Sequence, residues 1–177
     1  EVLCVGACVF NHMDQPPIQI GKLQRYSTDM AFEQDWTYFE AGPDTGKSVG
    51  LVGGGPASLA CAHELRRQGH RCTIYEKRDI LGGLNTYGVA PYKMKADRSI
   101  EEIEWLLKIG GIDIVHGVSI GSDVTWQELD ERHDALFIGL GLGEDRHLQV
   151  PGRDLGGVYG AVENIEMMKL GPLEKVG

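Results

Sequence analysis

From residue 48 onward, apolar positions along the chain follow two different patterns. Some segments are continuous apolar runs, which are typical of strands buried on both faces of a parallel sheet. Others place apolar residues three and four positions apart, which predicts amphipathic helices. The predicted strands are 48–55, 71–77, 111–117 and 134–141, and the predicted helices are 56–69, 98–110, 122–131 and 160–171. Strands that alternate with helices predict an α/β fold, a Rossmann-like doubly wound parallel sheet.

The first 46 residues follow a different pattern. The pair Pro16-Pro17 predicts an extended or turning backbone, because proline restricts both its own φ and the residue before it. Apolar residues within 21–36 recur at roughly helical spacing. We therefore expect a mainly helical arm over residues 1–46. Residues 47–177 are expected to form the Rossmann-like domain, incomplete at its C-terminal end.

Charge and composition narrow the classes of partner. The chain has 177 residues, a formal net charge of −9 and four cysteines. An acidic surface repels phosphate backbones and anionic lipids, so we expect neither nucleic acid nor a membrane as a partner. No apolar run reaches the roughly 18 residues that a membrane-spanning helix needs. Four cysteines are too few for a secreted disulfide scaffold, which favours a reducing, cytoplasmic location.

The segment GLVGGGPASLA, residues 50–60, loosely fits the G-x-G-x-x-G/A pattern of dinucleotide-binding loops. Gly53 would make the tight turn, Gly55 would let the backbone approach a pyrophosphate, and Ser58 is small enough for close packing of helix and strand. Glu76 ends the next predicted strand, where a carboxylate accepts hydrogen bonds from the ribose hydroxyls of a dinucleotide. The pattern predicts a dinucleotide site; a plain strand–turn–helix without a ligand is the alternative.

A second glycine pair, Gly82 and Gly83, follows Glu76 by about six residues. FAD extends further beyond its pyrophosphate than NAD does, so additional backbone that can approach the cofactor closely is useful. The second pair therefore favours FAD over NAD as the ligand.

These segments together resemble a known family. The run GGGPASLACAHELRRQGHRCTIYEKRDILGGLNTYGVAPYKMK is similar to the FAD segment of the glutamate synthase small subunit and of the N-terminal part of dihydropyrimidine dehydrogenase. The resemblance continues through DALFIGLGLGE and VPGRDLGGVYGAVENIEMM. It also covers the arm, where LCVGACVFNHMDQPPIQIGKLQRYSTD is similar to the iron–sulfur segment that precedes this flavin domain. The motifs PAS and GLGLGE favour the dihydropyrimidine dehydrogenase branch.

The resemblance implies a set of cofactor-binding residues and no catalytic acid or base. The residues expected at the pyrophosphate are Gly53, Gly55, Pro56, Ala57 and Ser58. Those expected at the adenosine ribose and along the path onward are Glu76, Lys77, Gly83 and Leu84. Ile120 is expected to touch the adenine end through its backbone, and Lys93 falls where the family has a basic residue near the flavin. A solvated lysine is the alternative for Lys93.

The resemblance also implies metal ligands in the arm. The family pattern there is C-x5-C-x3-C, and Cys4 and Cys8 match its last two cysteines. Gln24 matches the glutamine that completes one [4Fe–4S] site in the dihydropyrimidine dehydrogenase branch. Because the first cysteine of the pattern would precede residue 1, we expect no intact cluster in this chain. Two inward-packing free cysteines, or a zinc site, are the alternatives.

The function that these features imply is that of a flavoprotein in electron transfer. The chain would be the flavin-binding part of an NAD(P)H-dependent oxidoreductase, passing electrons from NAD(P)H through FAD to iron–sulfur clusters, as in dihydropyrimidine dehydrogenase. No second dinucleotide motif follows Gly55, so the NAD(P)H-binding domain and the electron-accepting subunit or domain are expected elsewhere in a longer polypeptide. The alternatives are a fragment of an NADPH-dependent glutamate synthase small subunit and a non-catalytic interaction module with a dinucleotide fold.

Overall fold

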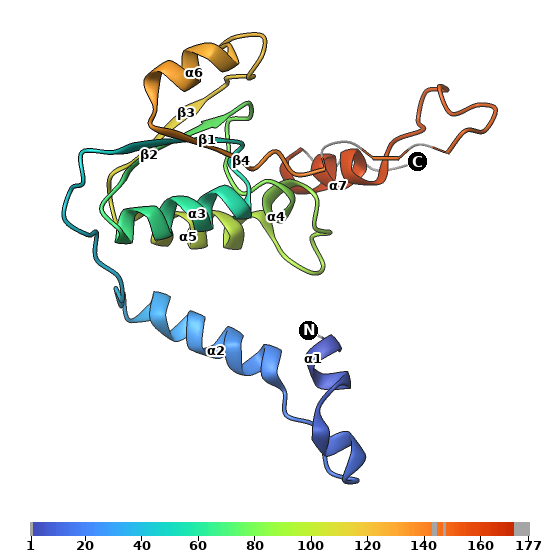
Figure 1. Ribbon diagram of the computed structural model, residues 1–177. Helices are drawn as coiled ribbons and strands as arrows, with labels where there is room; N and C mark the ends of the chain where they lie inside the picture. Colours follow the sequence, from blue (N-terminus) through green and yellow to red (C-terminus); the bar gives the residue numbers. More distant parts are fainter. Residues whose placement is uncertain (1, 143–144, 147, 172–177) are drawn as a thin grey trace. The chain divides into compact units, whose positions relative to one another are not determined.

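The computed structural model describes residues 2–142, 145–146 and 148–171, and it divides the chain into two compact units (Figure 1). The first unit is Glu1–Phe39 and the second is Glu40–Gly177. Within the described residues, no helix is both long and apolar enough to cross a membrane.

The first unit is helical and has little core of its own. Its elements are the helix α1 (Val2–Gly6), the 3₁₀ helix η1 (Val9–His12) and the helix α2 (Ile20–Glu33). The Asn11 side-chain amide donates to the carbonyls of Val5 (2.8 Å) and Gly6 (3.0 Å), which fixes η1 against the end of α1. Cys8 and Ala31 are the buried residues among those described in this unit. So small a core provides little hydrophobic stabilisation.

The boundary between the units lies between Phe39 and Glu40, earlier than the sequence pattern places it. Residues 40–47 join the second unit because they bind the C-terminal end of α3 (Pro56–Arg67) and the start of β2 (Arg71–Glu76). The Gly42 N–H donates to the Arg66 carbonyl at 2.9 Å, and the Asp44 carboxylate pairs with Arg71 at 2.6 Å. A domain boundary predicted from composition cannot take such long-range contacts into account.

The second unit is an α/β domain built on one parallel sheet, which confirms the predicted fold class. The sheet has the strand order β3-β2-β1-β4, and all three neighbouring pairs are parallel. Helices α3 and α5 cover one face and α6 lies on the other (Figure 1). The strands not yet given are β1 (Ser48–Val52), β3 (Ile112–His116) and β4 (Ala135–Ile138). The remaining helices are α4 (Leu84–Tyr87), α5 (Ala96–Leu107), α6 (Trp126–Arg132) and α7 (Ala161–Leu170).

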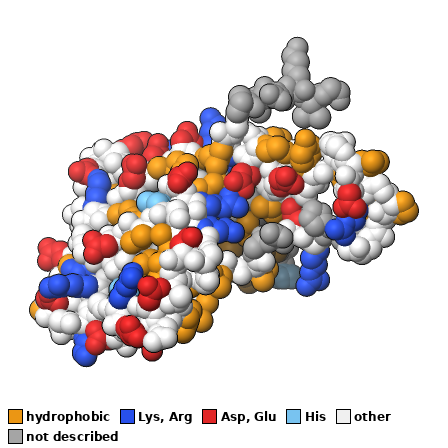
Figure 2. Space-filling view, turned by 90° about the horizontal axis from the view of Figure 1, so that it is seen from above, with side chains coloured by type: hydrophobic (Ala, Val, Ile, Leu, Met, Phe, Trp, Pro, Cys, Tyr) orange, Lys and Arg blue, Asp and Glu red, His pale blue; other side chains and the backbone are white. Residues whose placement is uncertain are grey.

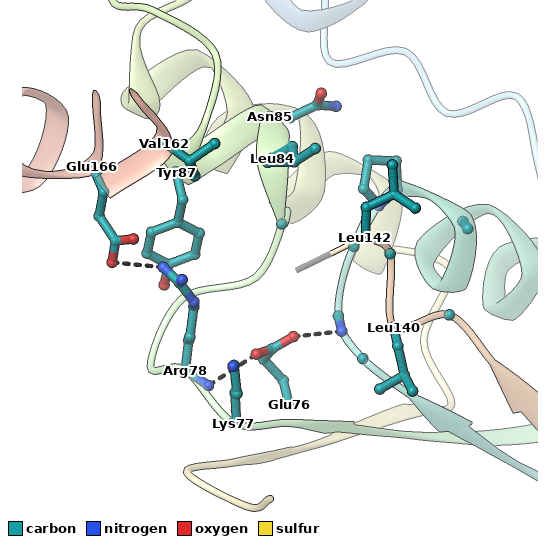
Figure 3. A pocket seen from close by; sticks show the side chains of 18 of the residues that line it. Glu76, Lys77, Arg78, Leu84, Asn85, Tyr87, Leu140, Leu142, Val162 and Glu166 are labelled. Atoms are coloured by element: carbon teal, nitrogen blue, oxygen red, sulfur yellow. Dashed lines mark hydrogen bonds and ion pairs between the residues drawn. The ribbon is translucent and has the colours of Figure 1, made fainter. Parts of the chain in front are cut away.

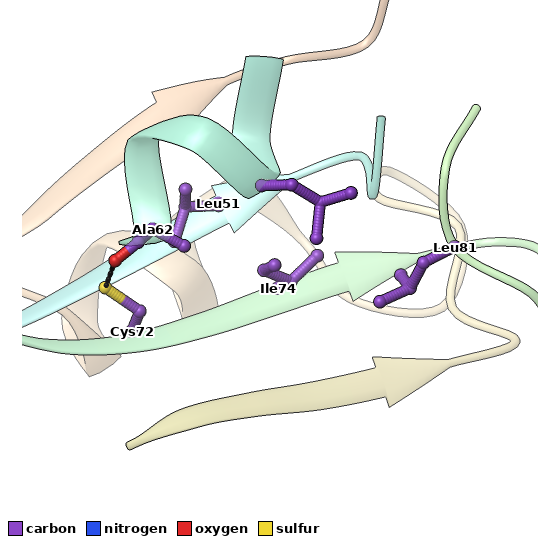
Figure 4. Packing of buried hydrophobic residues seen from close by; sticks show 6 residues of the cluster. Leu51, Ala62, Cys72, Ile74 and Leu81 are labelled. Carbon is purple, nitrogen blue, oxygen red and sulfur yellow. Dashed lines mark hydrogen bonds between the residues drawn. The ribbon is translucent and has the colours of Figure 1, made fainter. Parts of the chain in front are cut away.

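The main core lies between the sheet and α3 (Figure 4). The Cys72 thiol is 1% exposed and contacts the Ala62 carbonyl at 3.6 Å. Burial raises the pKa of the Cys72 thiol to about 11, so this cysteine stays protonated and serves as a small apolar residue. The buried members of this core are Leu51, Leu59, Ala62, Cys72, Ile74 and Leu81.

The opposite face of the sheet carries a smaller core around Val52, Tyr75 and Leu129. Beside it, the Tyr75 hydroxyl lies 2.9 Å from Nε2 of His133. A side chain at Gly50 would collide with the His133 ring, since a Cβ built there lies 2.6 Å from His133 Cδ2. Gly50 therefore makes room for a packed histidine.

Helix α6 begins directly after Thr125, which is its N-cap. The Thr125 hydroxyl accepts a hydrogen bond from the Glu128 N–H at 3.2 Å, and the Glu128 carboxylate accepts one from the Thr125 N–H at 2.8 Å. This reciprocal pair is a capping box. The nearby Asp123 carboxylate accepts a hydrogen bond from the Ser119 N–H.

Candidate functional site

A pocket of about 830 Å³ opens at the carboxyl ends of β1, β2 and β4 (Figure 3). The chain runs from β1 through α3 to β2 on one side, whereas β4 pairs with β1 on the other. The order in which the chain adds strands therefore reverses between β1 and β4. Open parallel sheets bind ligands at the carboxyl ends of the strands at such a point. The first glycine loop, the second glycine loop and the N-terminal part of α7 all line this pocket.

The first glycine loop forms one side of the pocket floor. Gly53 has φ +93°, and a Cβ built there would lie 2.7 Å from the Gly139 carbonyl oxygen on the neighbouring strand end. Gly55 is the N-cap of α3 and provides no side-chain cap, and Pro56 occupies the first turn. The first N–H groups of α3 are therefore left for a ligand, and the helix dipole favours an anion at this position.

The second glycine loop meets the first one backbone to backbone. The Gly82 N–H donates to the Gly54 carbonyl at 2.8 Å. Gly83 has φ +50°, and a Cβ built there would lie 3.1 Å from Gly55 Cα. A side chain at Gly83 would therefore crowd the first loop. The pocket floor is thus a surface of bare backbone that a ligand can approach closely.

Glu76 ends β2 beside the first loop and is only 8% exposed. Its carboxylate accepts hydrogen bonds from the backbone N–H groups of Gly54 (2.6 Å) and Arg78 (2.9 Å). These two backbone N–H groups fix the position of the Glu76 carboxylate and stabilise its negative charge. Because each carboxylate oxygen has two lone pairs, Glu76 can still accept hydrogen bonds from a ligand hydroxyl.

The wall opposite Glu76 comes from α7. Val162, Glu163 and Glu166 line the pocket there. The Asp145 carboxylate accepts a hydrogen bond from the Val162 N–H at 2.7 Å, so the start of α7 already has a negative partner. The Arg78 guanidinium pairs with the Glu166 carboxylate at 2.6 Å, and this contact raises the pKa of Arg78.

Comparisons with known proteins agree with this geometry. The NAD(P)-binding Rossmann-like domain family matches residues 51–99, which contain both glycine loops and Glu76. The glutamate synthase [NADPH] small chain of Bacillus subtilis is 38% identical over 166 residues, which is 93% of this chain and 33% of that protein. The putative glutamate synthase [NADPH] small chain of Cereibacter sphaeroides is 34% identical over 90% of this chain and 39% of its own length. The chain is homologous to one segment of the glutamate synthase small chains.

The chain therefore spans between a third and two fifths of the length of these relatives. Among solved structures, FprA of Mycobacterium tuberculosis in complex with NADPH is similar, with a TM-score of 0.56 and 28% identity over 71% of this chain and 29% of that one. A 2-naphthoyl-CoA reductase complex matches with a TM-score of 0.52 and 27% identity, over 68% of this chain and 17% of its own. Both matches agree with the Rossmann-like fold.

Most of the cofactor-binding residues expected for this family come together around the pocket. Ser58, Lys93 and Ile120 do not line it. Ser58 is fully buried behind the loop and packs against Gly139. Lys93 is exposed, with its ammonium 5.9 Å from the Tyr92 ring, and Ile120 packs against the core on the far face of the sheet. Those that do line the pocket are Gly53, Gly55, Pro56, Ala57, Glu76, Lys77, Gly83 and Leu84.

The pocket also contains residues that the sequence pattern does not point to. Gly139 and Gly141 directly follow the apolar strand β4, and glycines at the end of a parallel strand are a signal that could have placed them here. Arg78 lies two positions after Glu76 and belongs to no recognised motif. Glu166 lies on α7, far along the chain, and no local pattern connects it with Glu76.

The predicted metal ligands lie in the first unit. Cys4 on α1 is exposed, Cys8 after α1 is buried, and Gln24 on α2 is exposed. In the part of the chain that the structure describes, no three His, Cys, Asp or Glu side chains come together to hold a metal ion. An iron–sulfur role for Cys4, Cys8 and Gln24 stays a prediction.

Proposed function

We propose that the pocket binds FAD through its ADP half, and that the chain is the flavin-binding part of an NAD(P)H-dependent oxidoreductase. The observation that carries this proposal is the contact between the two glycine loops beside Glu76. It gives one surface of bare backbone that is wide enough for a ligand extending past its pyrophosphate. The uncapped first turn of α3 would hold the pyrophosphate, and Glu76 would hold the adenosine ribose.

The charges around Glu76 favour an adenosine without a 2′-phosphate. A carboxylate accepts hydrogen bonds from ribose hydroxyls but repels a phosphate at the same place. A nearby arginine could attract such a phosphate, but Arg78 is paired with Glu166 and lies 4.2 Å over the Tyr87 ring. The pocket therefore suits FAD better than NADPH. NADPH, which the names of the relatives include, would then bind to a different domain of the whole protein.

Within that role, each pocket residue binds or orients and none transfers a proton. Gly53, Gly55, Pro56 and Ala57 form the pyrophosphate side, and Lys77, Gly83 and Leu84 lie along the path beyond the ribose. FAD would supply the chemistry of accepting a hydride and releasing single electrons. Lys93 and Ile120 do not line the pocket. They would touch FAD only where the cofactor extends beyond it.

The electron path of the whole protein is also part of the proposal. Electrons would pass from NAD(P)H, bound by a separate domain, to FAD and then through [4Fe–4S] clusters to an electron-accepting subunit or domain. The resemblance to dihydropyrimidine dehydrogenase supports this path, and the protein would be cytoplasmic. The names of the relatives favour glutamate synthesis as a second candidate for the use of the electrons.

A titration that compares ligands tests the site. Glu76→Ala should weaken FAD binding about 10- to 100-fold, because a hydrogen bond to a charged group contributes about 1.5–3 kcal/mol. Asp113→Asn, an exposed carboxylate on the neighbouring strand β3, is the control and should leave FAD binding unchanged. ADP should bind more tightly than 2′-phospho-ADP to the unsubstituted chain.

Circular dichroism shows first that the Glu76→Ala chain is folded, because this carboxylate also holds two backbone N–H groups. Unchanged FAD affinity in a folded Glu76→Ala chain would contradict the placement of the ribose. Equal affinity for ADP and 2′-phospho-ADP would contradict the argument from charge. A folded chain that binds no FAD at all would favour the non-catalytic interaction module.

A further inference from the structure

Helix α7 forms a wall of the pocket although none of its side chains is buried. It contacts the short helix α4, but its methionines Met167 and Met168 remain 40% and 37% exposed. A helix that buries so little apolar surface gains little from the hydrophobic effect. Its position against the pocket therefore depends on a few polar contacts.

Two of these contacts join the C-terminal half of α7 to Arg78, which follows β2, and to Asn85 in α4. The Glu166 carboxylate pairs with the Arg78 guanidinium at 2.6 Å, and the two side chains are 36% and 35% exposed. The Lys169 ammonium donates to the Asn85 carbonyl at 2.8 Å, and burial lowers the pKa of Lys169. Half-buried charged contacts are stronger than exposed ones, because water screens them less.

Arg78 itself is held at three points, as Figure 3 shows. Its backbone N–H donates to the Glu76 carboxylate at 2.9 Å, and its guanidinium lies 4.2 Å over the ring of Tyr87 while pairing with Glu166. The Tyr87 hydroxyl accepts from the Ile80 N–H at 3.1 Å and donates to the Ile80 carbonyl at 2.9 Å. The ring is thus a fixed platform for the guanidinium.

We propose that Arg78 is a positioning residue that couples the ribose-binding carboxylate Glu76 to the docking of α7, so that α7 closes more firmly when a dinucleotide occupies the pocket. The same residue orients Glu76 through its backbone and holds α7 through its side chain. Coupling of this kind is reciprocal: firm docking of α7 tightens ligand binding, and the ligand stabilises docked α7. This inference rests on the proposed function.

The test compares ion pairs of the same kind at two places. Glu166→Gln removes the charge from the α7 partner of Arg78. Glu101→Gln is the matched control, because Glu101 pairs with Arg98 at 2.6 Å on α5 and lies outside the pocket lining. The double variant Arg78→Glu with Glu166→Arg exchanges the two charges, so that an ion pair can still form between positions 78 and 166. The readouts are the FAD dissociation constant and amide hydrogen exchange over α7, with and without FAD.

For Glu166→Gln we expect on the order of threefold to tenfold weaker FAD binding and faster exchange over α7, because measured couplings begin at about fivefold. Glu101→Gln should change neither quantity. The charge exchange should recover part of the FAD affinity, because it restores an ion pair between residue 78 and α7. In the unsubstituted chain, FAD should slow exchange over α7.

The inference is overturned if Glu166→Gln and Glu101→Gln bind FAD equally well, or if FAD leaves exchange over α7 unchanged in the unsubstituted chain. Failure of the proposed function looks different, because the unsubstituted chain itself would then not bind FAD. In that case the coupling fails with it, and exchange over α7 in Glu166→Gln still shows whether the ion pair anchors the helix.

Discussion

Replacing Gly53 by alanine separates two reasons for which the first turn of the pocket needs glycine. The first reason is backbone conformation, since φ is +93° at this residue. The second is space, since a Cβ built there would lie 2.7 Å from the Gly139 carbonyl oxygen. Gly121 offers a matched control, because its φ is +100° and a Cβ there would meet nothing within 4 Å.

The expected losses of stability follow from backbone strain and from crowding. A side chain held at such a φ costs about 1–3 kcal/mol, and both alanine variants pay this cost. Crowding against a fixed neighbour costs about 1–3 kcal/mol more, and it applies to Gly53→Ala alone. We therefore expect Gly53→Ala to lower the free energy of unfolding by about 2–6 kcal/mol and Gly121→Ala by about 1–3 kcal/mol.

Urea unfolding followed by far-ultraviolet circular dichroism measures the difference. The slope of the free energy against urea should be the same in both variants, so the midpoints report stability directly. Gly53→Ala should unfold at clearly lower urea than Gly121→Ala. If Gly53→Ala is as stable as Gly121→Ala or more so, then the contact between Gly53 and the end of β4 does not constrain the turn, and the reasoning is refuted.

Three further predictions concern other parts of the second unit. Gly83→Ala should weaken FAD binding and also lower the urea midpoint, because φ +50° with ψ −131° is a backbone conformation that alanine rarely adopts and because the new Cβ would lie 3.1 Å from Gly55 Cα; unchanged FAD affinity would count against contact between the loops. Burial lowers the pKa of His133, so the unfolded chain takes up a proton first, and stability should fall as the pH drops below about 6.5 toward the lowered value. His133→Gln should make that fall shallower in unfolding curves between pH 7 and pH 5, and an identical pH dependence would show that another group is responsible. Thr125→Ala should cost about 1 kcal/mol by opening the capping box of α6, as read from the urea midpoint; no shift would mean that the cap contributes nothing to stability.

The fold was predictable because its signals are local. Continuous apolar runs placed all four strands near their observed bounds, and helical spacing placed the longer helices. The helix α4 was not predicted, since four residues are too few to show a helical period. The boundary between the units depends on contacts of Gly42 and Asp44 with a distant part of the chain, which composition does not reveal.

The pocket residues that belong to a sequence motif were predictable. Those that meet only because of the tertiary fold were not. The two glycine loops and Glu76 have characteristic spacings because a turn, a close approach and a strand end each demand a particular residue. Arg78 and Glu166 meet only because α7 returns to the end of β2, and many other charged pairs in this acidic chain would fit the sequence equally well. Long-range ion pairs have no local spacing that could identify them.

The most direct test of the central proposal is the stoichiometry of FAD on the chain. The chain is equilibrated with FAD, dialysed against a measured free FAD concentration, and its visible spectrum is recorded beside its circular dichroism. We expect one FAD per chain at saturation, with the two flavin bands shifted from those of free FAD. A folded chain whose FAD content equals that of the surrounding buffer would contradict the proposal.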